Sequence, residues 1–195
     1  GRAIYPDLPK LQDTARAKPG MLWLVGNEPD CIHQDNVLPE TYAEQYHAVY
    51  TALKEADPTC RVAIGGMVQA TPLRFQWLNR VWSHYQTQYG TTMPVDVWNV
   101  HNFVLQERRY DWGCEIPPGI SAMQGRVCGI DEHDSMELFR RQIVDFRTWM
   151  ANHGQRNKPL IVSEYGILFH EGLGYGYERV RDFMLASFDY FLTAG

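Results

Sequence analysis

Four short apolar runs, each followed by a stretch with helical periodicity, constrain the fold of this chain more than any other feature. The runs lie near residues 21–27, 60–65, 95–101 and 159–164. The first run is too short for a buried helix, and nearly every residue in it is apolar, so this strand should be buried on both faces, as in a parallel sheet. Alternating strands and helices imply right-handed crossovers between parallel strands. The sequence therefore predicts an α/β fold with four βα units in a single domain, residues 1–195.

The segments between the runs carry helix signals at their ends. Thr71 and Pro72 suit an N-cap and a first helical residue, and Gly154 suits a helix end. The expected helices cover 8–17, 40–56, 72–89, 135–153 and 177–192. In the last of them, the apolar stripe predicted to face inward consists of Val180, Phe183, Met184, Ser187, Phe188 and Phe191.

Two of the apolar runs end on a glutamate. The first run leads into Glu28 and then Pro29, which lacks the amide hydrogen that a strand ladder needs and so ends the strand. The last run ends on Glu164. Ligands of parallel α/β folds bind at the carboxyl ends of the strands. The two glutamates are therefore a candidate acid/base or acid/nucleophile pair, whereas one such glutamate alone is more often an ordinary surface charge.

These motifs resemble those of a known class of enzymes. Asn27-Glu28-Pro29 after a strand, with Ser163-Glu164-Tyr165-Gly166 near the C-terminus, is similar to the pattern of the clan A glycoside hydrolases. Those are retaining enzymes on a (β/α)8 barrel and include cellulase-type, mannanase-type and β-xylosidase-type families. The resemblance implies that Glu28 is the acid/base and Glu164 the nucleophile. It also implies that Asn27 contacts the sugar, and we expect the same of Tyr165, the aromatic neighbour of Glu164.

The resemblance also implies how much of the barrel is present. The four units match strands four to seven, so the chain would hold about half of a (β/α)8 TIM barrel. Four parallel strands cannot close on themselves, because closure takes about eight. The strands near 21–27 and 159–164 would then have bare edges, which natural proteins avoid. We therefore expect a partial TIM-barrel catalytic domain that is either a piece of a longer chain or a half-barrel that pairs with a second copy.

The third strand ends on a polar residue of interest, His101. In the clan, strand six often carries a His or Tyr that faces the sugar or the nucleophile, in a pattern close to His-x-Tyr. Here the residues are His101-Asn102-Phe103, so the hydroxyl is missing. His101 is either a substrate contact or a satisfied polar residue at a strand end. The missing hydroxyl favours the alternative function, a non-catalytic carbohydrate-binding or scaffold protein on the same fold.

A long connection, residues 104–132, follows the third strand, and such loops are often binding loops. Its Trp112 either stacks on a sugar ring or anchors the loop on the core. Cys114 and Cys128 bracket its Gly/Pro-rich part and either form a disulfide or remain free thiols. The acidic cluster that ends at Asp134 is better explained as a helix start, with Asp134 as the N-cap, than as a metal site.

Charge and composition narrow the class of partner. The net charge of -5 argues against nucleic acid and anionic membranes. No apolar run approaches the ~20 residues of a membrane span. A two-glutamate hydrolase needs neither metal nor cofactor, so we expect none, and a carbohydrate is the expected partner. The chain begins without Met, which is compatible with a removed leader and an extracellular location.

Overall fold

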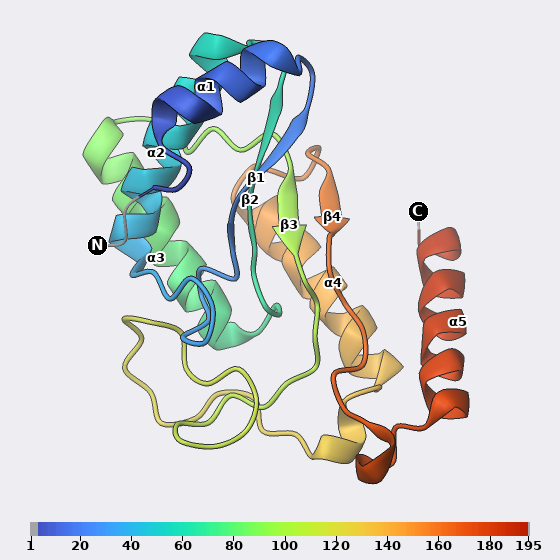
Figure 1. Ribbon diagram of the computed structural model, residues 1–195. Helices are drawn as coiled ribbons and strands as arrows, with labels where there is room; N and C mark the ends of the chain where they lie inside the picture. Colours follow the sequence, from blue (N-terminus) through green and yellow to red (C-terminus); the bar gives the residue numbers. More distant parts are fainter. Residues whose placement is uncertain (1–3, 195) are drawn as a thin grey trace.

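The computed structural model describes residues 4–194 and shows an α/β arrangement around a small parallel sheet (Figure 1). Its strands are β1 (Leu22–Asn27), β2 (Arg61–Gly66), β3 (Trp98–Val100) and β4 (Leu160–Val162). Its α-helices are α1 (Leu8–Ala17), α2 (Pro39–Ala56), α3 (Pro72–Tyr89), α4 (Met136–Asn152) and α5 (Tyr177–Thr193). Two short 3-10 helices are η1 (Ile130–Glu132) and η2 (Glu171–Leu173).

The strands lie in sequence order and all run in parallel. β1 pairs with β2, and β3 pairs with β4. Isolated parallel bridges from Ala63 to Val97 and from Met67 to Val100 connect β2 to β3. In the described residues β1 and β4 are each paired on one side only. The predicted parallel α/β arrangement is therefore present, and this part of the chain forms no closed barrel.

The third strand is shorter than predicted. Residues 95–97 run beside β2, where the Asp96 amide donates to the Val62 carbonyl oxygen at 3.0 Å. The Asp96 carboxylate in turn accepts the Val62 amide at 2.9 Å. The Asp96 side chain therefore accepts a hydrogen bond that a backbone carbonyl accepts in a regular pair of strands, and the regular strand begins only at Trp98.

The main core lies between the sheet and the helices α2, α3 and α4. Helix α2 buries one face, which includes Tyr42, Tyr46 and Leu53. Helix α3 begins as predicted, with the Thr71 side chain as N-cap. The largest fully buried apolar side chains of this core include Tyr46, Leu53, Trp77, Leu78, Tyr85, Trp98 and Phe146. Burial of such side chains supplies about 1.5–3 kcal/mol each, which holds the sheet and thus the strand ends in place.

Helix α5 contradicts one prediction. Of its apolar stripe only Phe183 and Ser187 are buried, whereas Met184 is 43% and Phe188 49% exposed. Figure 1 shows α5 (red) standing beyond α4 and β4, at one end of the described chain. The prediction that the whole stripe faces inward is wrong, because α4 packs on one side of α5 while Met184 and Phe188 stay open to solvent. In the described residues no helix is long and apolar enough to cross a bilayer.

Helix α4 begins one residue later than predicted. Its N-cap is Ser135, whose hydroxyl accepts the Leu138 amide at 3.4 Å. Asp134 instead accepts hydrogen bonds from the Arg179 guanidinium of α5 at 2.5 Å and 2.6 Å. The prediction of Asp134 as N-cap is therefore wrong, because its carboxylate is held by a cation from a distant helix.

Candidate active site

Glu28 lies directly after β1, at the carboxyl end of the sheet. Its amide donates to the Gly66 carbonyl at 3.1 Å, and its own carbonyl accepts the Cys31 amide at 2.9 Å. The backbone of Glu28 has φ 46°, a left-handed conformation that is uncommon for residues other than glycine. These features turn the chain sharply after the strand and leave Glu28 only 5% exposed.

His101 brings the two glutamates together. Its Nδ1 lies 2.9 Å from Oε1 of Glu28 and 3.6 Å from Oε2 of Glu164. One oxygen of each carboxylate and a ring nitrogen of His101 all lie within 4.8 Å of one another. The Glu28 side chain is 7% exposed, whereas that of Glu164 is 55% exposed. The predicted pair thus converges at one point, with one carboxylate buried and the other open to solvent.

The same three side chains could also hold a metal ion. Two carboxylates and an imidazole are a donor set for a divalent cation, and in the described chain this group alone brings such donors together. A hydrogen bond already accounts for the contact between His101 and Glu28.

Strand β2 provides the space for His101. A Cβ placed on Gly66 would lie 2.1 Å from Cδ2 and 2.3 Å from Nε2 of His101. Side-chain atoms cannot approach so closely, so His101 can occupy this position only above a glycine. The glycine that ends β2 thus permits a close approach, and the approaching group is the imidazole of the site itself.

A fully buried ion network, which sequence reasoning missed, lies behind the Glu28 turn. The Arg74 guanidinium donates to Asp30 at 3.2 Å and to Glu107 at 3.0 Å, and all three side chains are 0% exposed. It also donates to the carbonyl oxygens of Cys114 at 2.9 Å and Glu115 at 2.7 Å. Burial raises the pKa of Asp30 to about 6, although the charge of Arg74 opposes this shift. The network ties the turn that follows Glu28 to α3 and to the long connection.

The long connection is anchored at further points. The Thr71 hydroxyl donates to Glu107 at 2.6 Å, and the Arg126 amide donates to the other oxygen of Glu107 at 2.9 Å. Cys114 and Cys128 are buried free thiols, and the Cys114 sulfur lies 3.7 Å from the carbonyl oxygen of Gln106. The disulfide, one of the two alternatives from the sequence, is therefore absent, and polar contacts hold the loop instead.

Two of the predicted sugar contacts occupy different environments. Asn27 is exposed at the end of β1, where its side chain donates to Gln34 at 3.3 Å. The Tyr165 ring packs between helices, 5.4 Å from the Phe139 ring, and its hydroxyl accepts from Ser187 at 3.3 Å. Asn27 can therefore reach solvent at the strand end, whereas Tyr165 is half-buried and its ring contacts the rings of Phe139 and Phe183. Their contacts with sugar stay predictions.

Trp112 lies in the long connection, beside the loop that follows β4. Its ring meets the Phe169 ring edge-on at 5.6 Å. It also packs against a small apolar cluster that includes Val68, Phe103 and Leu105. These contacts fit the alternative in which Trp112 anchors the loop, and stacking on a sugar stays a prediction.

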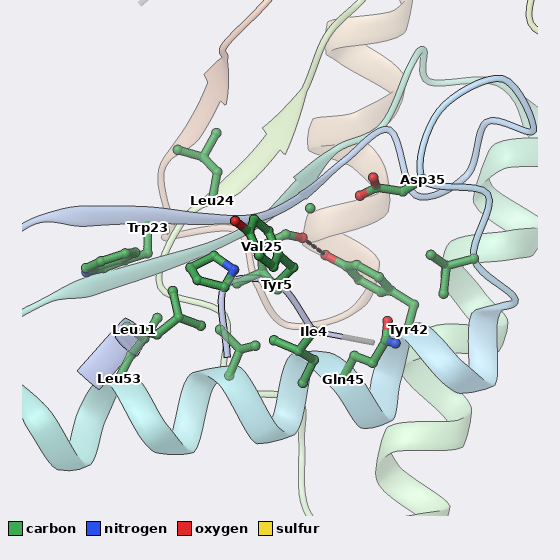
Figure 2. Close-up of a pocket in the computed structure, with 14 residues that line it drawn as sticks. Ile4, Tyr5, Leu11, Trp23, Leu24, Val25, Asp35, Tyr42, Gln45 and Leu53 are labelled. Atoms are coloured by element: carbon green, nitrogen blue, oxygen red, sulfur yellow. Dashed lines mark hydrogen bonds between the residues drawn. The ribbon is translucent and has the colours of Figure 1, made fainter. Parts of the chain in front are cut away.

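A separate cavity of about 530 Å³ lies beside β1, between that strand, α2 and the segment before α1 (Figure 2). Trp23 and Leu53 contribute to its apolar wall, and the Tyr42 hydroxyl at its edge donates to the Val25 carbonyl at 2.8 Å. Asp35 is a polar group in the lining. Neither glutamate of the pair lines this cavity, so it is distinct from the candidate active site.

Comparisons with known proteins add little to this geometry. No protein-family model and no curated protein matches the chain. The structure is similar to an endo-beta-1,3-glucanase of glycoside hydrolase family 128 (subgroup II) from Pseudomonas viridiflava, with a TM-score of 0.46 and 17% sequence identity. The match covers 82% of this chain and 66% of the glucanase chain, just under two thirds of its length. A likeness at this level does not establish a shared fold, so function has to be argued from the site.

Proposed function

We propose that the protein is a retaining glycoside hydrolase that cleaves O-glycosidic bonds of a β-linked oligo- or polysaccharide. The observation that carries the proposal is the convergence of Glu28 and Glu164, whose carboxylate oxygens approach within 4.8 Å. Retaining enzymes hold their two carboxyl groups ~5–5.5 Å apart, whereas inverting enzymes need ~6.5–9.5 Å to admit a water molecule. The short separation supports the retaining mechanism.

The two glutamates take different roles in the proposed reaction. Glu164 attacks the anomeric carbon as the bond to the leaving oxygen breaks, and Glu28 gives its proton to that oxygen. In the second step Glu28 removes a proton from water, which attacks the same carbon and releases Glu164. Glu164 has the more exposed side chain and can reach a sugar from solvent, while buried Glu28 has a fixed position.

His101 supports this division of roles. Its Nδ1 carries at most one hydrogen and lies between the two carboxylates, closer to Glu28. When Glu28 is a carboxylate, the ring can donate to it and hold it towards the substrate. We propose that His101 orients Glu28 relative to Glu164, and that Asn27, Tyr165 and Trp112 are sugar contacts.

The proposal is tested by Glu164→Gln assayed on aryl β-glycosides. Loss of the nucleophile should lower kcat/KM by roughly 1,000-fold or more, because the glycosyl-enzyme can no longer form. Glu171→Gln is the matched control, since Glu171 is an exposed glutamate in the same loop. A mechanism-based fluorosugar should label Glu164, as mass spectrometry of the peptides will show. Activity of Glu164→Gln near that of the wild type would remove Glu164 from the mechanism.

The second candidate function is a carbohydrate-binding or scaffold protein without turnover. The observation in its favour is Phe103, which is 5% exposed and packs in an apolar cluster, so it brings no hydroxyl to the site. The fluorosugar separates the two candidates. A binding protein would associate with β-linked oligosaccharides in calorimetry and leave Glu164 unmodified.

A further inference from the structure

His133 joins two loops next to the candidate active site. It is 1% exposed and lies between η1 and α4. Its Nδ1 lies 2.8 Å from the carbonyl oxygen of Val104, and its Nε2 lies 2.9 Å from the backbone nitrogen of Leu168. A carbonyl only accepts and an amide only donates, so Nδ1 carries the hydrogen and Nε2 is the acceptor. The contacts therefore require a neutral imidazole in one tautomer.

Leu168 belongs to the segment that carries Glu164. After β4, the Ser163 amide donates to the Val100 carbonyl at 3.2 Å. The next backbone hydrogen bond along this described segment is the one from Leu168 to His133. Glu164 therefore lies between an anchor in the sheet and an anchor at His133. Because its side chain is 55% exposed, its direction depends on how firmly this backbone is held.

The surroundings of His133 favour the neutral form. The Phe169 ring lies 4.6 Å away and the Tyr175 ring 5.8 Å away. The charged groups that face His133 are Asp134, its neighbour in sequence, and Arg179 of α5, and these two bind each other. Burial lowers the pKa of His133 below its usual range, while its contact with the Val104 carbonyl opposes that shift.

We propose that His133 is a positioning residue for Glu164 and holds the loop after β4 only while its imidazole is neutral. Protonation converts Nε2 from an acceptor into a donor, so that two N–H groups face each other at the Leu168 contact. The loop then loses its anchor, and the carboxylate of Glu164 loses its fixed place beside Glu28. This inference rests on the proposed function, because it describes how acid would regulate the same site.

Hydrogen exchange at the Leu168 amide tests the anchor without any substrate. Between about pH 7.5 and pH 4.5 the protection factor in the wild type should fall about tenfold as His133 protonates. His133→Gln can donate and accept but does not titrate in this range, so its protection should stay high and independent of pH. His133→Phe should show low protection at every pH. His153→Gln is the control, because Nδ1 of His153 also contacts a backbone carbonyl, that of Trp149 at 2.8 Å, but within a helix end.

Two results would overturn the proposal. One is a Leu168 protection factor in the folded wild type that does not change with pH. The other is protection in His133→Phe equal to that of the wild type. With aryl β-glycosides as substrate, kcat of His133→Phe should fall about tenfold, because Glu164 is no longer held in place. His133→Gln should keep kcat near that of the wild type, and the fall of kcat at acid pH should be weaker in this variant than in the wild type. The expected exchange pattern without any hydrolysis by the wild type would overturn the proposed function and leave His133 as the anchor of this loop.

Discussion

Replacement of Arg74 by Met removes the only cation that contacts Asp30 and Glu107 in the buried network of the described chain. The guanidinium satisfies five acceptor atoms, one from each of the two carboxylates and three backbone carbonyls of Asp30, Cys114 and Glu115. Met fills most of the volume but donates no hydrogen bond. The substitution therefore isolates the electrostatic and hydrogen-bonding role of Arg74 rather than its packing.

The loss of stability depends on how the two remaining carboxylates, those of Asp30 and Glu107, are compensated. Removing one partner of a buried ion pair typically costs about 3–5 kcal/mol, because the other charge is left without compensation. Asp30 can escape part of this by taking up a proton, since its pKa is already raised to about 6. Glu107 keeps hydrogen bonds from Thr71 and Arg126. We therefore expect a loss near the lower end of that range, about 3 kcal/mol of the free energy of unfolding at neutral pH.

Urea unfolding of the wild type and Arg74→Met gives this free energy by linear extrapolation. Arg80→Met is the matched control on the same helix, because Arg80 pairs with Glu40 at 2.6 Å but its side chain is 45% exposed. Exposed pairs contribute about 0–1 kcal/mol, so the control should change little. A loss below about 1 kcal/mol for Arg74→Met, or equal losses for both variants, would refute the reasoning.

Two further predictions concern the surroundings of Glu28. Gly66→Ala should displace the His101 ring, since the new Cβ would lie 2.1 Å from it, and should lower kcat/KM on aryl β-glycosides about 100-fold. Gly176→Ala should leave kcat/KM nearly unchanged, because a Cβ there meets nothing closer than 3.7 Å. Asp30 has a pKa raised to about 6 in the folded protein, so its contribution to stability is full below the ordinary value of 3.8 and is lost as the pH rises through 6. From about pH 7.5 to pH 5 the free energy of unfolding of the wild type should rise by about 1 kcal/mol more than that of Asp30→Asn, which does not titrate. An equal pH dependence in both proteins would contradict the raised pKa of Asp30.

The order of strands and helices was predictable because local patterns determine it. Apolar runs that end at Asn27 and Val162 mark strands, and the N-cap Thr71 and the C-terminal Gly90 bound a helix. The meeting of Glu28 and Glu164 followed from the same patterns. Parallel strands present their carboxyl ends at one edge, so residues far apart in sequence arrive together.

Contacts between residues far apart in the sequence could not be predicted from such local patterns. Arg74 contacts Asp30 and Glu107, which lie 44 and 33 residues away in the sequence. It falls on the buried face of α3, in register with Trp77 and Leu78, but that register does not show which carboxylates it meets. In α5, periodicity showed which face is apolar but not whether another element covers Met184. Covering depends on neighbours in space, and the sequence of one helix contains no information about them.

The backbone conformation of Glu28 lowers the stability of the folded protein by a small amount. Glycine adopts a φ of 46° freely, whereas glutamate there stores strain of about 1 kcal/mol. A chain optimised for robustness alone would place glycine or asparagine after β1. The protein instead tolerates this conformational penalty and keeps an acidic group at this point, where the proposed function uses it as the acid/base.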